Sequence, residues 1–109
     1  MDLDWTKKEF EVYVLLYAAH CNYIESEEEK KYILSKVDEK TFNKMHTEVV
    51  VESEHKNIQK IKQYLNNNKY SISDRKDLIN DIKEVFFADG TVDAIERKIF
   101  ILLKDILKP

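Results

Sequence analysis

Glycine and proline are almost absent from this sequence, which contains one of each among 109 residues. Average usage would place on the order of a dozen of them in a chain of this length. Turn-rich β-sandwiches and β-barrels need many such residues at their turns, and collagen-like or flexible segments need more. The scarcity excludes these classes and favours an all-α fold. The chain is also too short for two separate cores, so we expect one domain.

Cysteine and long apolar runs are scarce as well. Cys21 is the single cysteine, so the chain cannot form an internal disulfide or offer two thiolates to a metal. The most apolar stretch, Phe10–Cys21, is interrupted by Glu11 and His20 and is shorter than the roughly 20 residues of a membrane span. The acidic segment Met1–Asp4 does not resemble a signal peptide. We therefore expect a cytoplasmic protein without a transmembrane segment.

A surplus of positive charge is missing too, because 18 Lys and Arg against 21 Asp and Glu give a net charge of −3. Nucleic-acid phosphates and anionic membranes attract basic proteins, so we expect no nucleic-acid partner. The remaining composition suits a helical bundle, since 43% hydrophobic residues can fill a core and 36% charged residues can cover it.

Helix starts can be located from the sequence, because an N-cap Ser, Thr or Asp three residues before a Glu satisfies free amides at a helix start. This capping-box spacing occurs at Thr6 with Glu9, Ser26 with Glu29, and Asp93 with Glu96. With the apolar periodicity, it predicts helices over 6–20, 27–37, 38–46, 53–65, from about Ser73 onward, and 93–107. The first is apolar on almost every side over Val12–Ala19, so we place it at the centre of the bundle.

Two connections are harder to assign. The β-branched run Val49–Val51 suits either a helix end or an extended connection, and a lone strand there would have no partner. Asn66–Asn68 is expected to close the preceding helix, because asparagine tolerates the left-handed backbone conformation.

The order of elements suggests an internal repeat. A helix, an acidic loop and a capped helix occur at 6–37 and again at 73–107, joined by 38–71. We therefore predict a single domain over 1–109 built from two pseudo-symmetric repeats. The register of the first loop stays open, since an offset of 68 pairs Glu28 with Glu96, whereas an offset of 67 pairs Ser26 with Asp93.

The second loop, Ala88–Glu96, resembles the back half of an EF-hand calcium loop. The front half would place Val85 and Phe87 at ligand positions, and neither supplies an oxygen, so an EF-hand is excluded. Hard cations bind oxygen ligands, so a weak Ca²⁺ or Mg²⁺ site is still chemically reasonable. Its candidate ligands are Asp89, Asp93 and Glu96, joined by Glu28 of the first loop.

A local structural interpretation explains the same residues, and it is the one we favour. Asp93 and Glu96 form a capping box. Gly90 supplies the positive φ of a tight turn, and Asp89 forms an Asx turn. In the first loop, Glu27–Glu29 suit a helix start, where the helix dipole favours negative charge.

Catalytic motifs are missing from the chain. A single glycine cannot form a phosphate-binding loop of the Walker or dinucleotide type. Cys21 lies beside His20, but His46 and His55 are far away in sequence and complete no ligand or triad spacing. We therefore predict no enzyme activity.

These residues resemble the TerB-like domains of tellurite-resistance and related stress proteins. The resemblance rests on Tyr17–His20 leading into an acidic loop with Glu28, and on Phe86–Glu96 leading into a leucine-rich helix. The family carries a signature of Ala, Asp, Gly and Glu twice. This chain has it once, as Ala88, Asp89, Gly90 and Glu96, and has His20–Tyr23 at the first copy instead.

The resemblance implies an all-α bundle with both acidic loops on one side. It also implies a link to tellurite or general stress, metal sensing or binding, docking to membrane-associated or chaperone-type machinery, and no established enzyme activity. We expect a small cytoplasmic protein-interaction module with a protein partner. The alternative is a divalent-cation-binding stress sensor that uses the loop carboxylates. The identity of the partner and the oligomeric state stay open.

Overall fold

The computed structural model describes residues 5–20, 27–87 and 94–108. Within these ranges the chain forms six helices and no strand, so the predicted all-α fold is confirmed. The helices are α1 (Lys7–His20), α2 (Glu27–Leu34), α3 (Glu39–Val51), α4 (Glu54–Asn67), α5 (Ile72–Phe87) and α6 (Ala94–Leu107). No described helix is long and apolar enough to cross a membrane.

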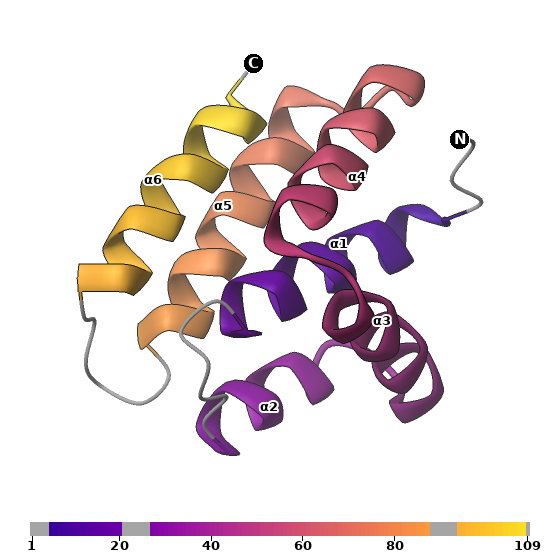
Figure 1. The fold of residues 1–109 in the computed structure, drawn as a ribbon, viewed down its shortest axis with the longest axis vertical. Coiled ribbons are helices and arrows are strands. Elements are labelled where there is room, and N and C mark those ends of the chain that lie inside the picture. Colours follow the sequence, from indigo (N-terminus) through magenta and orange to yellow (C-terminus); the bar gives the residue numbers. More distant parts are fainter. Residues whose placement is uncertain (1–4, 21–26, 88–93, 109) are drawn as a thin grey trace.

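α1 is the central helix of the bundle, as its apolar sequence predicts. Every residue from Val12 to Ala19 is buried, and α1 contacts each of the other five described helices. Figure 1 shows α1 crossing the middle of the molecule, with α5 and α6 together on one side and α2 and α3 on the other. The core therefore surrounds α1 instead of lying on one face of it.

Two helix boundaries in the first half differ from the prediction. α2 ends at Leu34 instead of continuing to Val37, because the chain turns there and Asp38 caps α3 by accepting a bond from the Thr41 amide at 3.1 Å. α3 continues past His46 to Val51, so the β-branched run is the end of a helix and not an extended connection. Val49 is buried in this last turn, and its packing accounts for the longer helix.

The connection between α4 and α5 corrects one further prediction, the left-handed conformation of the asparagine that closes α4. Asn68 has an extended backbone, with φ −131° and ψ 147°, and is not left-handed. It closes α4 by donating both its backbone amide and its Nδ2 to the Tyr64 carbonyl, each at 3.0 Å. α5 begins at Ile72, which agrees with the predicted start near Ser73, and the Ser71 Oγ caps the helix by accepting from the Asp74 amide at 3.0 Å.

The helix contacts are arranged in a way that the repeat hypothesis would require. α1 packs against α2 and α5 packs against α6, while α1 and α5 contact each other at the centre. The cross contacts of α1 with α6 and of α2 with α5 are present as well. Both loops of the proposed repeats, 21–26 and 88–93, lie outside the described residues, so the pseudo-symmetry stays a prediction.

A buried polar group joins three helices inside this apolar core. Asn57 of α4 is 2% exposed; its Oδ1 accepts the Tyr13 hydroxyl of α1, and its Nδ2 donates to the Val49 carbonyl of α3 at 3.2 Å. Burial raises the pKa of Tyr13, so its hydroxyl stays protonated as a donor at neutral pH. Asn57 also satisfies a carbonyl in the last turn of α3 that has no partner within that helix.

Aromatic side chains attach α4 and the start of α5 to α1. Phe10 stacks on Tyr64 with ring centroids 4.0 Å apart, and Tyr70 meets the Phe10 ring edge-on at 5.3 Å. The Tyr70 hydroxyl donates to Glu11 Oε2 at 2.6 Å. Desolvation and the Glu11 carboxylate both raise the pKa of Tyr70, so this hydroxyl is also a donor and not a phenolate.

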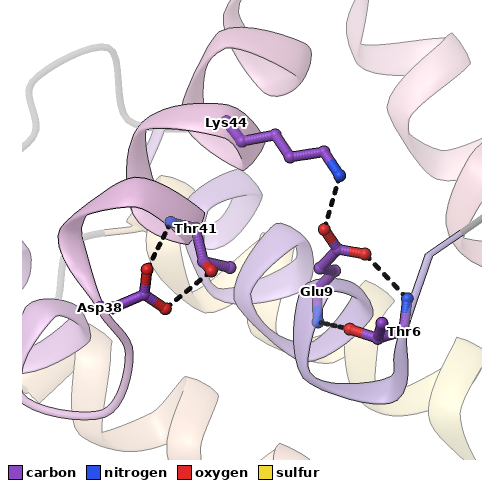
Figure 2. A network of polar contacts seen from close by, with 5 residues as sticks. All are labelled: Thr6, Glu9, Asp38, Thr41 and Lys44. Carbon is purple, nitrogen blue, oxygen red and sulfur yellow. Dashed lines mark hydrogen bonds and ion pairs between the residues drawn. The ribbon is translucent and has the colours of Figure 1, made fainter.

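The start of α1 carries the capping box that the spacing of Thr6 and Glu9 predicts. The Thr6 amide donates to Glu9 Oε1 at 2.9 Å and the Glu9 amide donates to Thr6 Oγ1 at 3.1 Å. Figure 2 shows that the second Glu9 oxygen faces Lys44 of α3, whose Nζ lies 2.6 Å away. These contacts lower the pKa of Glu9, the Lys44 hydrogen bond most of all.

Replacing Asn57 by alanine should lower the free energy of unfolding by about 2–3 kcal/mol, because a hydroxyl and a carbonyl lose their partner inside the core. Urea denaturation measures this change. Gln59→Ala on the exposed side of the same helix is the matched control, and it should change the free energy by less than about 0.5 kcal/mol. Equal losses in the two variants would contradict the role given to Asn57.

Replacing Glu9 by glutamine should destabilise the protein at neutral pH but not in acid. A lowered pKa means that the Glu9 carboxylate stabilises the fold above the usual glutamate pKa of about 4.3 and loses this effect as the pH falls through the folded-state value. Urea denaturation at pH 7 and at a series of lower values should show the gap between wild type and Glu9→Gln closing. In a Lys44→Gln background the gap should be smaller throughout, and an unchanged gap there would contradict the assignment.

Candidate functional site

The predicted cation site lies mostly beyond the described residues. Asp89, Gly90 and Asp93 fall in 88–93, and Ser26 falls in 21–26, so the structure does not place them. Glu28 belongs to α2, but its side chain is outside the described part as well. Of the four candidate ligands, the structure therefore positions the side chain of Glu96 alone.

Glu96 lies in the first turn of α6 and is buried, with 3% of its surface exposed. A carboxylate is favoured at this end of a helix by the dipole, but full burial is rare for glutamate. Among the described side chains, no three His, Cys, Asp or Glu gather closely enough to hold a metal ion. The structure thus brings Glu96 to the expected helix start, and the other predicted ligands lie outside the described side chains.

Described histidine side chains do not form a second candidate centre. His46 lies in α3 and stacks on Phe42 with ring centroids 5.7 Å apart and nearly parallel planes. His55 is exposed in the first turn of α4. Stacking on Phe42 therefore accounts for the position of His46, and His55 is a solvent-exposed surface residue.

The outer face of α6 is the first surface feature that the core does not explain. Ile101 is 60% exposed and Leu102 is 39% exposed. α6 packs on α5 and α1 through Ile99, Leu103 and Leu107, which are buried on its opposite side. Figure 1 shows α6 at the margin of the bundle, so this face is open to a partner.

Charged residues surround Ile101 at helical spacing. Lys98 and Lys104 lie three residues before and after it, and Arg97 and Asp105 lie four residues before and after it, all of them exposed. Residues at these spacings are neighbours on a helix surface. Ile101 and these four residues, which we call the α6 face, therefore combine an apolar centre with three positive charges and one negative charge.

A cleft of about 310 Å³ is the second surface feature. It lies where α4 ends, α5 begins and α6 ends, and Figure 1 shows these three ends on the same side of the molecule. We call it the α4–α6 cleft. Its lining residues are Lys62, Leu65, Asn66, Arg75, Ile106 and Lys108. Cationic and apolar groups thus line it, and none of its described lining residues carries a carboxylate.

Arg75 is the most firmly positioned side chain of the α4–α6 cleft. It is partly buried in the first turns of α5, where its Nε donates to the Tyr70 carbonyl at 3.1 Å. Its Nη1 donates to the Leu107 carbonyl at 3.2 Å, which satisfies a carbonyl at the end of α6. These two bonds hold the guanidinium plane in place and leave further N–H groups of the fork available.

Sequence reasoning missed both surface features. Helical spacing over 93–107 places Ile101 about 200° around the helix from Ile99 and Leu103, but this alone does not mark it as a binding residue. The charged residues at three and four positions on either side of Ile101 were the available signal. No local sequence pattern indicates the α4–α6 cleft, since Lys62, Arg75 and Lys108 come together only through tertiary packing.

Comparisons with known proteins do not identify a family for this chain. No protein-family model matches it, and no curated protein or solved structure matches it either. The α6 face and the α4–α6 cleft are therefore the features of this chain that bear on its function.

Proposed function

We propose that this chain is a TerB-like, non-catalytic protein-interaction module of a stress response, and that it binds its partner through the α6 face. The observation that carries the proposal is the exposure of Ile101. Its side chain is 60% exposed and is surrounded by charged side chains on α6, the helix at the edge of the bundle. Contiguous exposed apolar surface rimmed by polar residues is typical of a protein interaction site, and Ile101 with the neighbouring, 39% exposed Leu102 forms such surface on α6. The signature Ala88, Asp89, Gly90 and Glu96 supports the family assignment.

Charge complementarity indicates an acidic segment of a partner protein as the ligand. Arg97, Lys98 and Lys104 give the α6 face a net charge of +2 after Asp105 is subtracted, although the whole chain carries −3. A partner helix or strand with one apolar residue against Ile101 and carboxylates around it would match both parts of this surface.

A second copy of this chain fits the α6 face less well. Two such faces would bring three cations against three cations, and each Asp105 could pair with one of them at most. Like charges across an interface oppose association, so self-pairing through α6 is disfavoured.

A photo-crosslinking amino acid at position 101 tests this proposal in the native lysate. The expected result is an adduct whose crosslinked peptide is acidic and whose yield falls about tenfold or more in the Lys98→Glu, Lys104→Glu variant. The charge-matched control is Lys40→Glu, Lys83→Glu, two exposed lysines of α3 and α5, and it should leave the yield unchanged.

The same crosslinker at the exposed Asn43 of α3 reports non-specific contact. An adduct that also forms from position 43, that is insensitive to charge reversal on α6, or that joins two copies of this chain would overturn the proposal. Circular dichroism before crosslinking should show every variant folded, because all the substituted side chains are exposed.

Divalent-cation binding is the second candidate, and the burial of Glu96 favours it. Buried carboxylates in proteins are paired or bind metals, and Glu96 starts the helix that follows Asp89 and Asp93 in sequence. Calorimetry with Ca²⁺, Mg²⁺, Mn²⁺ and Zn²⁺ should then detect a dissociation constant below ~1 mM for one of them. Asp89→Asn should weaken this binding about tenfold, whereas Asp77→Asn on the exposed side of α5 should not. Absence of binding, or equal binding by both variants, contradicts this candidate.

A further inference from the structure

The α4–α6 cleft concentrates positive charge that the rest of the described chain does not neutralise. Lys62, Arg75 and Lys108 line it, and the lining includes no carboxylate. Other lysines of this protein do have acidic partners, as Lys7 with Asp74 at 2.9 Å shows. Within residues 5–20, 27–87 and 94–108, neither Lys62 nor Lys108 forms an ion pair, and the bonds of Arg75 go to carbonyl oxygens.

We propose that the α4–α6 cleft binds the phosphate group of a small molecule. A phosphoryl dianion matches three converging cations better than a carboxylate, whose single charge would leave most of the positive charge uncompensated. The guanidinium fork of Arg75 provides directional hydrogen bonds, and the two lysines act as flexible point charges at the edge of the cleft.

Arg75 is organised for this role before any ligand arrives. Its Nε and Nη1 each have a carbonyl acceptor, at 3.1 Å and 3.2 Å, so the plane of the guanidinium is fixed. An arginine has five N–H donors, and the two groups on Nη2 together with the second on Nη1 remain for an oxyanion. Fixing the donor beforehand reduces the entropy lost on binding.

The bond to the Leu107 carbonyl, which caps α6, is enough to account for the position of Arg75. It does not account for the presence of Lys62 and Lys108 in the same cleft. A purely structural cleft would be expected to resemble the smaller one of about 220 Å³ lined by Glu52, Lys56, Gln59, Lys60 and Gln63. There Lys60 lies 3.4 Å from Glu52, so the cleft supplies its own counter-charge. Among the residues that the structure describes, the α4–α6 cleft has no such internal partner, so an external anion would supply the counter-charge.

The remaining lining restricts the rest of the ligand. Leu65 and Ile106 give the cleft an apolar part, and Asn66 adds an amide that can donate or accept. A volume of about 310 Å³ is at the small end of ligand sites. The matching ligand is a phosphate monoester with a short apolar or weakly polar body.

Titration of the ¹⁵N-labelled protein with phenyl phosphate, inorganic phosphate and benzoate in a phosphate-free buffer tests the proposal. Phenyl phosphate should bind saturably and shift the Arg75 Nε–H signal and amides at the ends of α4 and α6. Inorganic phosphate should bind the same residues more weakly, because it lacks the apolar body. Benzoate has that body with a carboxylate instead, and it should bind at least about tenfold more weakly than phenyl phosphate.

Lys62→Gln with Lys108→Gln is the test variant, since both side chains are exposed and neither has an ion pair in the described chain. It should weaken phenyl phosphate about tenfold or more, whereas Lys40→Gln with Lys83→Gln should change the affinity less than about twofold. Binding of phenyl phosphate that is equal in the two variants, equal binding of benzoate, or no saturable binding by wild type would each overturn the proposal. Because the crosslinking test of the α6 face uses different lysines, each proposal can fail without the other.

Discussion

The enclosure of α1 is the constraint on which the rest of the structure depends. The segment Val12–Ala19 of α1 is apolar on almost every side and cannot border water, so it needs neighbours around its whole circumference. Six short helices satisfy this requirement because each of the other five needs to bury only one side of itself against α1 or its neighbours. Their outward sides are then free to carry charge, and this explains how a chain with 36% charged residues can still have a continuous core.

Features encoded locally in the sequence could be predicted, and features that depend on packing could not. The central position of α1 follows from Val12–Ala19 alone, and the cap at Thr6 follows from a spacing of three residues. The end of α3 depends on the burial of Val49, and Asn68 is extended because its amide and side chain share one carbonyl acceptor. The candidate site follows the same division: Lys62 and Lys108 lie 46 positions apart, so no local pattern indicates that they line one cleft.

The net charge of the chain does not predict the charge of its individual surface regions. The value of −3 describes the whole chain, but the exposed ring around Ile101 and the α4–α6 cleft are both positive. The α6 face and the α4–α6 cleft thus carry local positive charge on a chain that is acidic as a whole. Local positive charge attracts an approaching anion or acidic segment, which favours encounter at α6 and at its end.

The buried amide of Asn57 also fixes how α4 sits along α1. The next buried residue of α4 one turn further on is Ile61, four positions away and about 6 Å along the helix axis. If α4 slid by that turn, an aliphatic side chain would replace the amide opposite the Tyr13 hydroxyl, which would then be buried without an acceptor. Apolar contacts alone would tolerate such a slip, because isoleucine and leucine pack in many registers. One hydrogen-bonded asparagine therefore selects a single alignment of two helices that hydrophobic burial by itself would leave nearly degenerate.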